Sequence, residues 1–119
     1  MSGLIVKHFE KILQGDISAA DDYSEKLTCI ARVGGKPETL NSAGAKALLK
    51  RLQKLIPFQE AEVLVNRATE NYGVLAVQSS FAPFLSYACV AEKGKIIGAT
   101  LYIYQPAQDL APAVTPMPR

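Results

Sequence analysis

His8 is the single histidine of the chain, and histidine is the side chain whose charge changes most readily near neutral pH. Its neutral imidazole is suited to act as a general base or as a hydrogen-bond donor. A metal site needs three or more converging ligands, and no second histidine or HxxE-like spacing accompanies His8. His8 is therefore either a catalytic group or a buried histidine with hydrogen-bonded nitrogens, and we expect no metal.

Other motifs that carry chemistry are missing from the sequence. GxSxG, GxGxxG and GxxxxGK[ST] do not occur, so neither a hydrolytic triad nor a nucleotide-phosphate site has support. Cys29 and Cys89 lack a CxxC spacing, which favours two buried thiols over a redox pair or a metal site. The net charge of +2, without a basic stripe of interleaved aromatics, argues against nucleic acid. We expect no cofactor.

Aromatic residues give a weaker indication of a ligand. Tyrosine offers an apolar body with one polar tip, which suits the wall of a pocket for a hydrophobic, ring-bearing molecule. The aromatics on or beside the predicted elements are Tyr23, Phe58, Phe81, Phe84, Tyr87 and Tyr102. Gln78 and Ser80 interrupt an otherwise apolar strand on one side. These side chains either line a cavity or serve as core and solvated face, and the strand register decides between the two.

Helical periodicity dominates the first half of the chain. Apolar residues recur at spacings of three and four from about Leu4 to Leu13, and Gly15 ends this helix. Asp16 or Ser18 can cap a short second helix up to about Tyr23. A strand is predicted at 27–33, followed by a turn through Gly34-Gly35 and Lys36-Pro37. A third helix starts after Asn41 or Ser42 and ends before Pro57, with its cations, Arg51 among them, on the solvated face.

The period changes to two after Ala61. Strands are predicted at 60–69, 73–82, 84–91 and 95–104, with hairpins at Asn71-Tyr72-Gly73 and Glu92-Lys93-Gly94. Strands joined by such short loops pair antiparallel. The predicted fold class is α+β, a curved antiparallel sheet packed against three N-terminal helices, in one domain over 1–104. The segment 105–119 is rich in proline and alanine, and we expect a flexible tail.

The order of these elements resembles the nuclear transport factor 2-like superfamily, a cone-shaped, cystatin-like fold. That superfamily includes ketosteroid isomerases, SnoaL-like polyketide cyclases, scytalone dehydratase and limonene epoxide hydrolase. The resemblance covers about residues 3 to 104. Its anchors are Gly15-Asp16, the segment from Thr28 to Gly34, Ser42-Ala43-Gly44 and Gly94-Lys95-Ile96.

The resemblance implies a mostly apolar pocket between the helices and the concave sheet. The isomerases use a carboxylate base on the first strand, a tyrosine from the first helix and a protonated acid from the sheet. Counting from the anchors places His8 at the tyrosine position and Tyr87 near the acid donor. Ala31 takes the position of the base, or Ile30 or Arg32 if the register slips, and none of these is a carboxylate.

Three functions remain open on this evidence. One is an isomerase, cyclase or dehydratase with His8 and Tyr87 as catalytic groups, and Tyr23, Gln78, Phe81 and Tyr102 around the ligand. The second is a carrier of a small apolar molecule without proton chemistry, which the missing carboxylate favours. The third is a non-catalytic interaction module that forms a homodimer through its sheet.

The location of the protein is inferred from what the sequence lacks. The N-terminal apolar run ends after three residues, and no stretch reaches the ~20 apolar residues of a membrane span. We therefore expect a cytoplasmic protein without a membrane partner.

Overall fold

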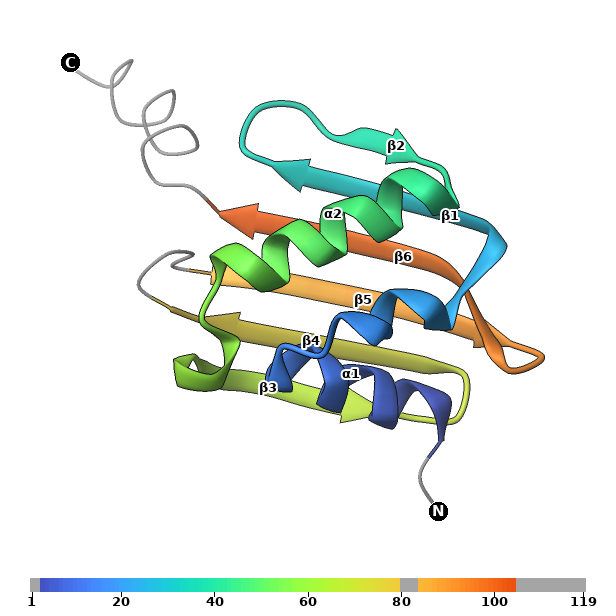
Figure 1. The fold of residues 1–119 in the computed structure, drawn as a ribbon, viewed down its shortest axis with the longest axis horizontal. Coiled ribbons are helices and arrows are strands. Elements are labelled where there is room, and N and C mark those ends of the chain that lie inside the picture. The colour runs from blue at the N-terminus through green and yellow to red at the C-terminus, as the bar shows by residue number, and fades with distance from the viewer. Residues whose placement is uncertain (1–2, 80–83, 105–119) are drawn as a thin grey trace, which may run out of the picture.

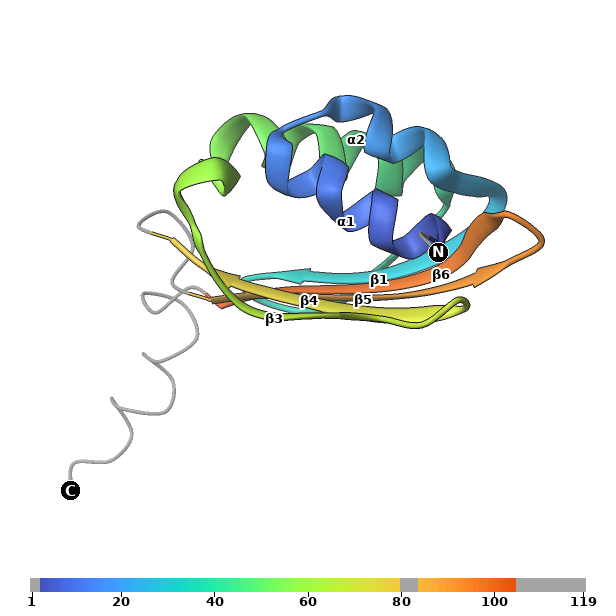
Figure 2. The same cartoon turned by 90° about the horizontal axis from the view of Figure 1, so that it is seen from below.

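The computed structural model describes residues 3–79 and 84–104, and places all helices on one face of a curved sheet (Figures 1 and 2). The helical elements are α1 (Leu4–Gln14), the 3-10 helix η1 (Ile17–Asp22), α2 (Ser42–Leu55) and the short 3-10 helix η2 (Phe58–Glu60). The strands are β1 (Tyr23–Val33), β2 (Glu38–Leu40), β3 (Glu62–Ala68), β4 (Tyr72–Gln78), β5 (Phe84–Glu92) and β6 (Lys95–Tyr104). The predicted α+β class is confirmed.

The sheet has the strand order β2-β1-β6-β5-β4-β3. Consecutive strands from β3 to β6 pair antiparallel, as predicted, whereas β1 pairs parallel with β6. Besides this parallel pairing, two further features were not predicted from the sequence. The first strand begins at Tyr23 rather than Leu27, and β2 adds an edge strand of 3 residues that pairs with β1.

Helix boundaries follow the capping residues that the sequence offers. Gly15 adopts a left-handed conformation with φ 76° and ends α1. The Asp16 side chain accepts a hydrogen bond from the Ser18 amide and starts η1, and the Asn41 side chain does the same for the Gly44 amide at the start of α2. These caps set the points at which the chain turns across the sheet.

Gly73 has a different role from the one its sequence context suggests. A glycine beside a hairpin turn can supply a positive φ, but Gly73 lies in β4 and its φ is not positive. A Cβ atom there would lie 2.5 Å from Ile5 Cγ2 and 2.9 Å from Phe9 Cε2. Glycine is therefore required because α1 packs directly on the backbone of β4.

Register determines which strand residues face the helices. One cross-strand row on the helix-covered face runs through Glu38, Ala31, Leu101, Tyr87, Leu75 and Asn66. Leu75, Tyr87 and Leu101 belong to the buried core. This row links the β2 edge of the sheet to its centre, and both candidate sites described below lie along it.

The remaining sequence predictions fall partly outside the described residues. Phe81, Ser80 and the segment 105–119 lie there, so their predicted roles stay predictions. No helix of the described residues is long and apolar enough to cross a membrane.

Candidate functional site

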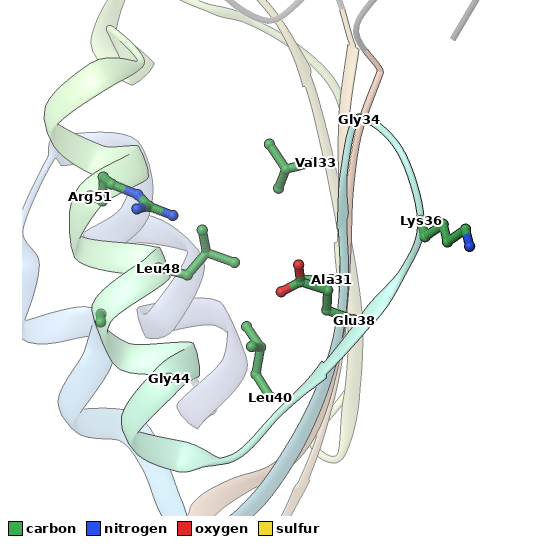
Figure 3. A pocket seen from close by; sticks show the side chains of 10 residues that line it. Ala31, Val33, Gly34, Lys36, Glu38, Leu40, Gly44, Leu48 and Arg51 are labelled. Atoms are coloured by element: carbon green, nitrogen blue, oxygen red, sulfur yellow. The ribbon is translucent and has the colours of Figure 1, made fainter. Parts of the chain in front are cut away.

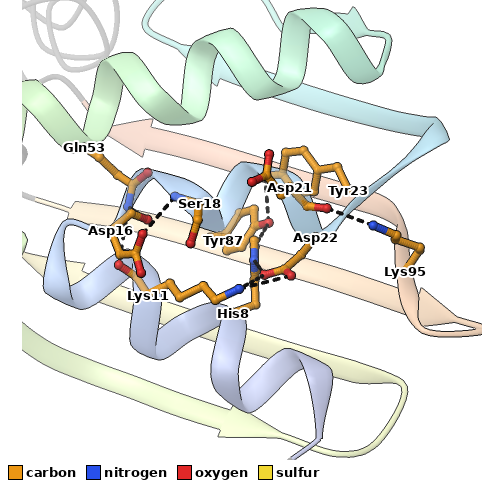
Figure 4. A network of polar contacts seen from close by, with 10 residues as sticks. All are labelled: His8, Lys11, Asp16, Ser18, Asp21, Asp22, Tyr23, Gln53, Tyr87 and Lys95. Atoms are coloured by element: carbon orange, nitrogen blue, oxygen red, sulfur yellow. Dashed lines mark hydrogen bonds and ion pairs between the residues drawn. The ribbon is translucent and has the colours of Figure 1, made fainter.

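Four of the described polar side chains form a hydrogen-bonded chain between the helices and the sheet (Figure 4). His8 Nδ1 lies 2.9 Å from Asp22 Oδ2, and His8 Nε2 lies 2.8 Å from the Tyr87 hydroxyl. The Tyr87 hydroxyl lies 2.8 Å from that of Tyr23. Lys11 Nζ donates to Asp22 Oδ1 at 3.3 Å. The structure thus brings His8, Tyr23 and Tyr87 together, and adds Asp22 and Lys11.

Each of these side chains is held by a different element. His8 projects from α1, Asp22 ends η1, Tyr23 starts β1, and Tyr87 lies in the middle of β5. Gln53 of α2 donates to the Asp16 carbonyl oxygen at 3.0 Å, which fixes the turn from α1 to η1 against α2. The chain of hydrogen bonds therefore fastens α1 and η1 to the sheet.

The proton positions in this chain follow from its acceptors. A carboxylate only accepts, so Nδ1 of His8 donates to Asp22. When Nε2 carries no proton, it accepts from the Tyr87 hydroxyl, whose oxygen can then accept from Tyr23. Every donor in the chain is then used, and His8 is 0% exposed.

The environment also acts on the acidic groups. Burial acts to raise the pKa of Asp22, but the hydrogen bonds and positive charges of His8 and Lys11 outweigh it and lower that pKa. Burial raises the pKa values of both Tyr23 and Tyr87. Both tyrosines therefore stay protonated donors at neutral pH.

Little open space surrounds this chain. The cavity beside Tyr87 measures about 10 Å³ and is otherwise lined by apolar side chains: Ile12, Leu49, Leu52, Phe58, Leu75, Leu85 and Leu101. A cavity of this size holds one water molecule at most. In this structure the interior of the cone is packed, and His8 and Tyr87 have no room for an organic ligand between them.

A larger open groove lies between α2 and the β1–β2 hairpin (Figure 3). Its volume is about 370 Å³. Its apolar lining comes from Ala31, Val33, Leu40, Ala47 and Leu48, with Gly34 and Gly44 at its ends.

The polar lining of the groove comes from Lys36, Glu38 and Arg51. Figure 3 shows the Arg51 guanidinium and the Glu38 carboxylate directed into the groove from opposite walls, while Lys36 is directed away from it. In the part of the chain that the structure describes, no ion pair or hydrogen bond joins Arg51 or Glu38 to another side chain. The groove thus presents two separate charges of opposite sign.

The hairpin that forms one wall of the groove is held from the other face of the sheet. Gly34 and Gly35 adopt φ values of 70° and 69°, a left-handed conformation that favours glycine. Arg32 Nε donates to the Gly35 carbonyl oxygen at 2.7 Å, and Arg32 Nη1 donates to the Tyr102 hydroxyl at 3.0 Å. The guanidinium carbon also lies 5.0 Å from the centre of the Tyr102 ring. Arg32 therefore positions the hairpin loop.

The other residues expected around a ligand are dispersed. Gln78 and Tyr102 occupy the outer face of the sheet, because their cross-strand partners Glu62 and Ser86 alternate with the inward-facing residues. They cannot line the same cavity as His8, Tyr23 and Tyr87.

Sequence reasoning missed the two charged groups of the groove. It assigned Arg51 to the solvated face of a helix, and it assigned Glu38 to no element. The segment Glu38-Thr39-Leu40 shows no alternation of polar and apolar residues, so the sequence carried no signal for β2.

The outer face of the sheet carries apolar side chains without a covering element among the described residues (Figure 2). Ile30, Tyr72 and Val90 are 47%, 49% and 42% exposed. Small residues, Ala88 and Gly98, leave a hollow between them. Among the described residues no three of the types His, Cys, Asp and Glu converge to hold a metal ion.

Comparison with known proteins identifies the fold. No protein-family model and no curated protein matches the sequence. Solved structures do match. A protein from Kribbella flavida has 12% identity and a TM-score of 0.67 over 97% of this chain and 95% of its own. An NTF2-like protein from Cytophaga hutchinsonii has 15% identity and a TM-score of 0.58, with coverage of 87% and 88%.

A third similar structure, from Mesorhizobium loti, is named as a SnoaL-like polyketide cyclase. It shares 14% identity and a TM-score of 0.57, over 83% of this chain and 95% of its own. The chain therefore has the nuclear transport factor 2-like fold, as its sequence predicts.

Proposed function

We propose that this protein binds a small, mostly apolar molecule in the groove between α2 and the β1–β2 hairpin. The observation that carries the proposal is that the groove is more enclosed than the other surface hollows of similar or larger volume, while the interior cavity is nearly filled. The groove offers about 370 Å³, within the range of ~300–1,000 Å³ that small-molecule sites occupy. The interior cavity offers about 10 Å³.

The composition of the groove supports this choice. Ala31, Leu40 and Leu48 give the groove an apolar wall, and charged and backbone groups supply an about equal polar part, so a ligand with both apolar and polar parts is suited to it. The similar structure named as a SnoaL-like polyketide cyclase agrees in kind, since it is named for a reaction on a polyketide, which is a small molecule. This is support by analogy of fold, which does not determine function.

Binding without proton transfer is the form of this function that the geometry favours. The hydrogen bonds of His8 are used by Asp22 and Tyr87. Tyr87 lies two strands away from Ala31 in the same cross-strand row, about 10 Å at the usual strand spacing. The buried hydrogen-bonded chain thus acts as a structural link, and the groove is the place for a ligand.

Two matched variants test the proposal. Ala43 and Ala47 are both exposed on α2, and only Ala47 lines the groove. We expect Ala47→Phe to fill the groove and to abolish the binding of anilinonaphthalene sulfonate, an apolar fluorescent anion. Ala43→Phe should bind this probe as the wild type does. Equal binding by all three proteins would overturn the proposal, and so would no binding by the wild type.

We propose in addition that the outer face of the sheet forms a homodimer. An exposed apolar patch spread over several strands rarely stays in contact with water. The expected dimer pairs the same face of two copies, so that Ile30, Tyr72 and Val90 are covered in both.

Sedimentation of variants tests this assembly. Val90→Glu places a charge in the patch and should convert a dimer into a monomer. Leu55→Glu is the control, because Leu55 is equally accessible, at 54%, but lies on α2. A monomeric wild type at high concentration would contradict the dimer.

A further inference from the structure

We infer that the ligand of the groove is dipolar: an apolar body that carries a carboxylate together with an ammonium group. This inference rests on the proposed function, and it names the class of molecule that the groove selects. Its basis is the pair of opposed charges, Arg51 and Glu38, on the two walls of one groove (Figure 3).

Arg51 is suited to the carboxylate end. A guanidinium offers five N–H donors in a planar fork that matches the two oxygens of a carboxylate. In the described structure these donors have no side-chain partner, and Figure 3 shows the guanidinium reaching from α2 over Leu48 into the groove. The other cations of this helix, Lys46, Lys50 and Lys54, do not line the groove.

Glu38 is suited to the ammonium end. Its carboxylate only accepts hydrogen bonds. Glu38 pairs across β1 and β2 with Ala31, so both residues face the helix-covered side of the sheet. The small Ala31 side chain leaves space in front of the carboxylate, and Figure 3 shows the Glu38 carboxylate beside it.

The two charges disfavour the simpler ligands relative to a dipolar one. A purely anionic ligand would be attracted by Arg51 and repelled by Glu38, and a purely cationic ligand would meet the reverse. A neutral apolar molecule would gain no attraction from either charge, since both exposed side chains would keep only water as a partner. A dipolar molecule satisfies both charges, and its apolar body covers Val33, Leu40 and Leu48.

The Gly34-Gly35 loop supports a fixed spacing between the two charges. Arg32 holds this loop through the Gly35 carbonyl oxygen at 2.7 Å, and Glu38 follows the loop within the same hairpin. The position of the Glu38 backbone is therefore set before a ligand arrives, which reduces the ordering cost of binding.

Matched probes test the inference by calorimetry at low ionic strength. Phenylalanine carries both charged groups, phenylpropionate lacks the ammonium, and phenethylamine lacks the carboxylate. A second series places the two charges farther apart. In it para-(aminomethyl)benzoate carries both charged groups, para-methylbenzoate lacks the ammonium and benzylamine lacks the carboxylate. In at least one series the dipolar probe should bind about three- to tenfold more tightly than either partner, the size expected for one charge-assisted hydrogen bond at a partly exposed site.

Charge-removing variants then assign each end. In Arg51→Gln the dipolar probe should bind no better than the amine that lacks the carboxylate. In Glu38→Gln the dipolar probe should bind no better than the acid that lacks the ammonium. The same acid should bind Glu38→Gln more tightly than it binds the wild type, because the repelling carboxylate is gone. General destabilisation of the protein would weaken the binding of all probes alike. It would not remove the preference for the dipolar probe over one particular partner in each variant.

The outcomes separate this inference from the proposed function. If anilinonaphthalene sulfonate binds in the groove but dipolar and singly charged probes bind equally or not at all, the ligand class is wrong and the groove remains a binding site. If no probe of any kind binds, both statements are wrong. A preference that survives Arg51→Gln and Glu38→Gln also overturns the dipolar ligand.

Discussion

The substitution Tyr87→Phe tests the role of the buried hydrogen-bonded chain. It removes one hydroxyl that serves two partners, the Nε2 atom of His8 and the hydroxyl of Tyr23, both at 2.8 Å. No other partner of either atom is found among the described residues. A buried polar group left unsatisfied costs about 1–3 kcal/mol, so two such groups cost about 2–6 kcal/mol. That is a large part of the ~5–15 kcal/mol that stabilises an ordinary domain.

The matched control is Tyr23→Phe. It leaves the Tyr87 hydroxyl donating to His8 and removes only a donor to the Tyr87 oxygen, so it should cost about 1 kcal/mol, the net value of one hydrogen bond. Urea unfolding of wild type and both variants measures the difference, with equal m-values as the check that the unfolded states are comparable. If Tyr87→Phe were no more destabilising than Tyr23→Phe, the chain would not be continuous and our account of His8 as a structural residue would be refuted.

Four further predictions concern packing, the groove and pH. Gly73→Ala should lower the unfolding free energy by about 1–3 kcal/mol through overpacking, whereas Gly98→Ala, with no atom within 4 Å of its new Cβ, should leave it unchanged. Similar thermal midpoints for the two variants would disprove the close approach of α1 to the backbone of Gly73. Arg32→Ala should speed amide hydrogen exchange in the Gly34-Gly35 loop while the core amides keep their protection. Unchanged exchange in the loop would mean that the loop conformation does not depend on Arg32. Burial raises the pKa of Cys89 from an ordinary 9.0 to about 12, so the protonated thiol contributes fully to the free energy of unfolding below pH 9, and this contribution declines as pH rises above 9. Cys89→Ala should therefore reduce the loss of stability between pH 9 and 12, and an unchanged loss in this variant would contradict the raised pKa. The pKa of Asp22 lies below its ordinary 3.8, so the Asp22 carboxylate stabilises the folded protein fully above pH 3.8, and this stabilisation is lost as pH falls through the lowered pKa. Asp22→Asn should therefore lose less stability in acid than the wild type, and an equal dependence of unfolding free energy on pH would contradict this prediction.

The sequence determined much of this fold because several of its signals are local. The Lys93-Gly94 turn was predictable since a positive φ suits these positions, and the structure has φ values of 54° and 80° there. The caps at Asp16 and Asn41 were predictable because their side-chain oxygens can accept hydrogen bonds from the backbone amides at the start of a helix. Each of these features depends on residues within a few positions of one another.

Features that depend on contacts between distant segments were not predictable. The parallel pairing of β1 with β6 joins residues that are far apart in the chain. Gln78 and Tyr102 face outward rather than toward a ligand, because a shift of one residue in strand register exchanges the two faces of a sheet. Asp22, the partner of His8, comes from the end of another helix, and no sequence pattern connects the two residues.

The candidate site shows the same division. Ala31 carries no carboxylate, which the sequence itself shows, but the groove that Ala31 lines depends on how α2 and the β1–β2 hairpin diverge. A strand of three residues, such as β2, has too short a pattern to predict. For that reason Glu38 was not recognised as a groove residue.

Methyl NMR during a titration with anilinonaphthalene sulfonate tests the central claim most directly, because it locates the ligand within the fold. Our account predicts shifts at the methyl groups of Ala47 and Leu48, which line the groove, and none at Ile12 and Leu75, which line the small interior cavity. Shifts at Ile12 and Leu75, with Ala47 and Leu48 unchanged, would show that the cone opens to bind its ligand and would contradict the account.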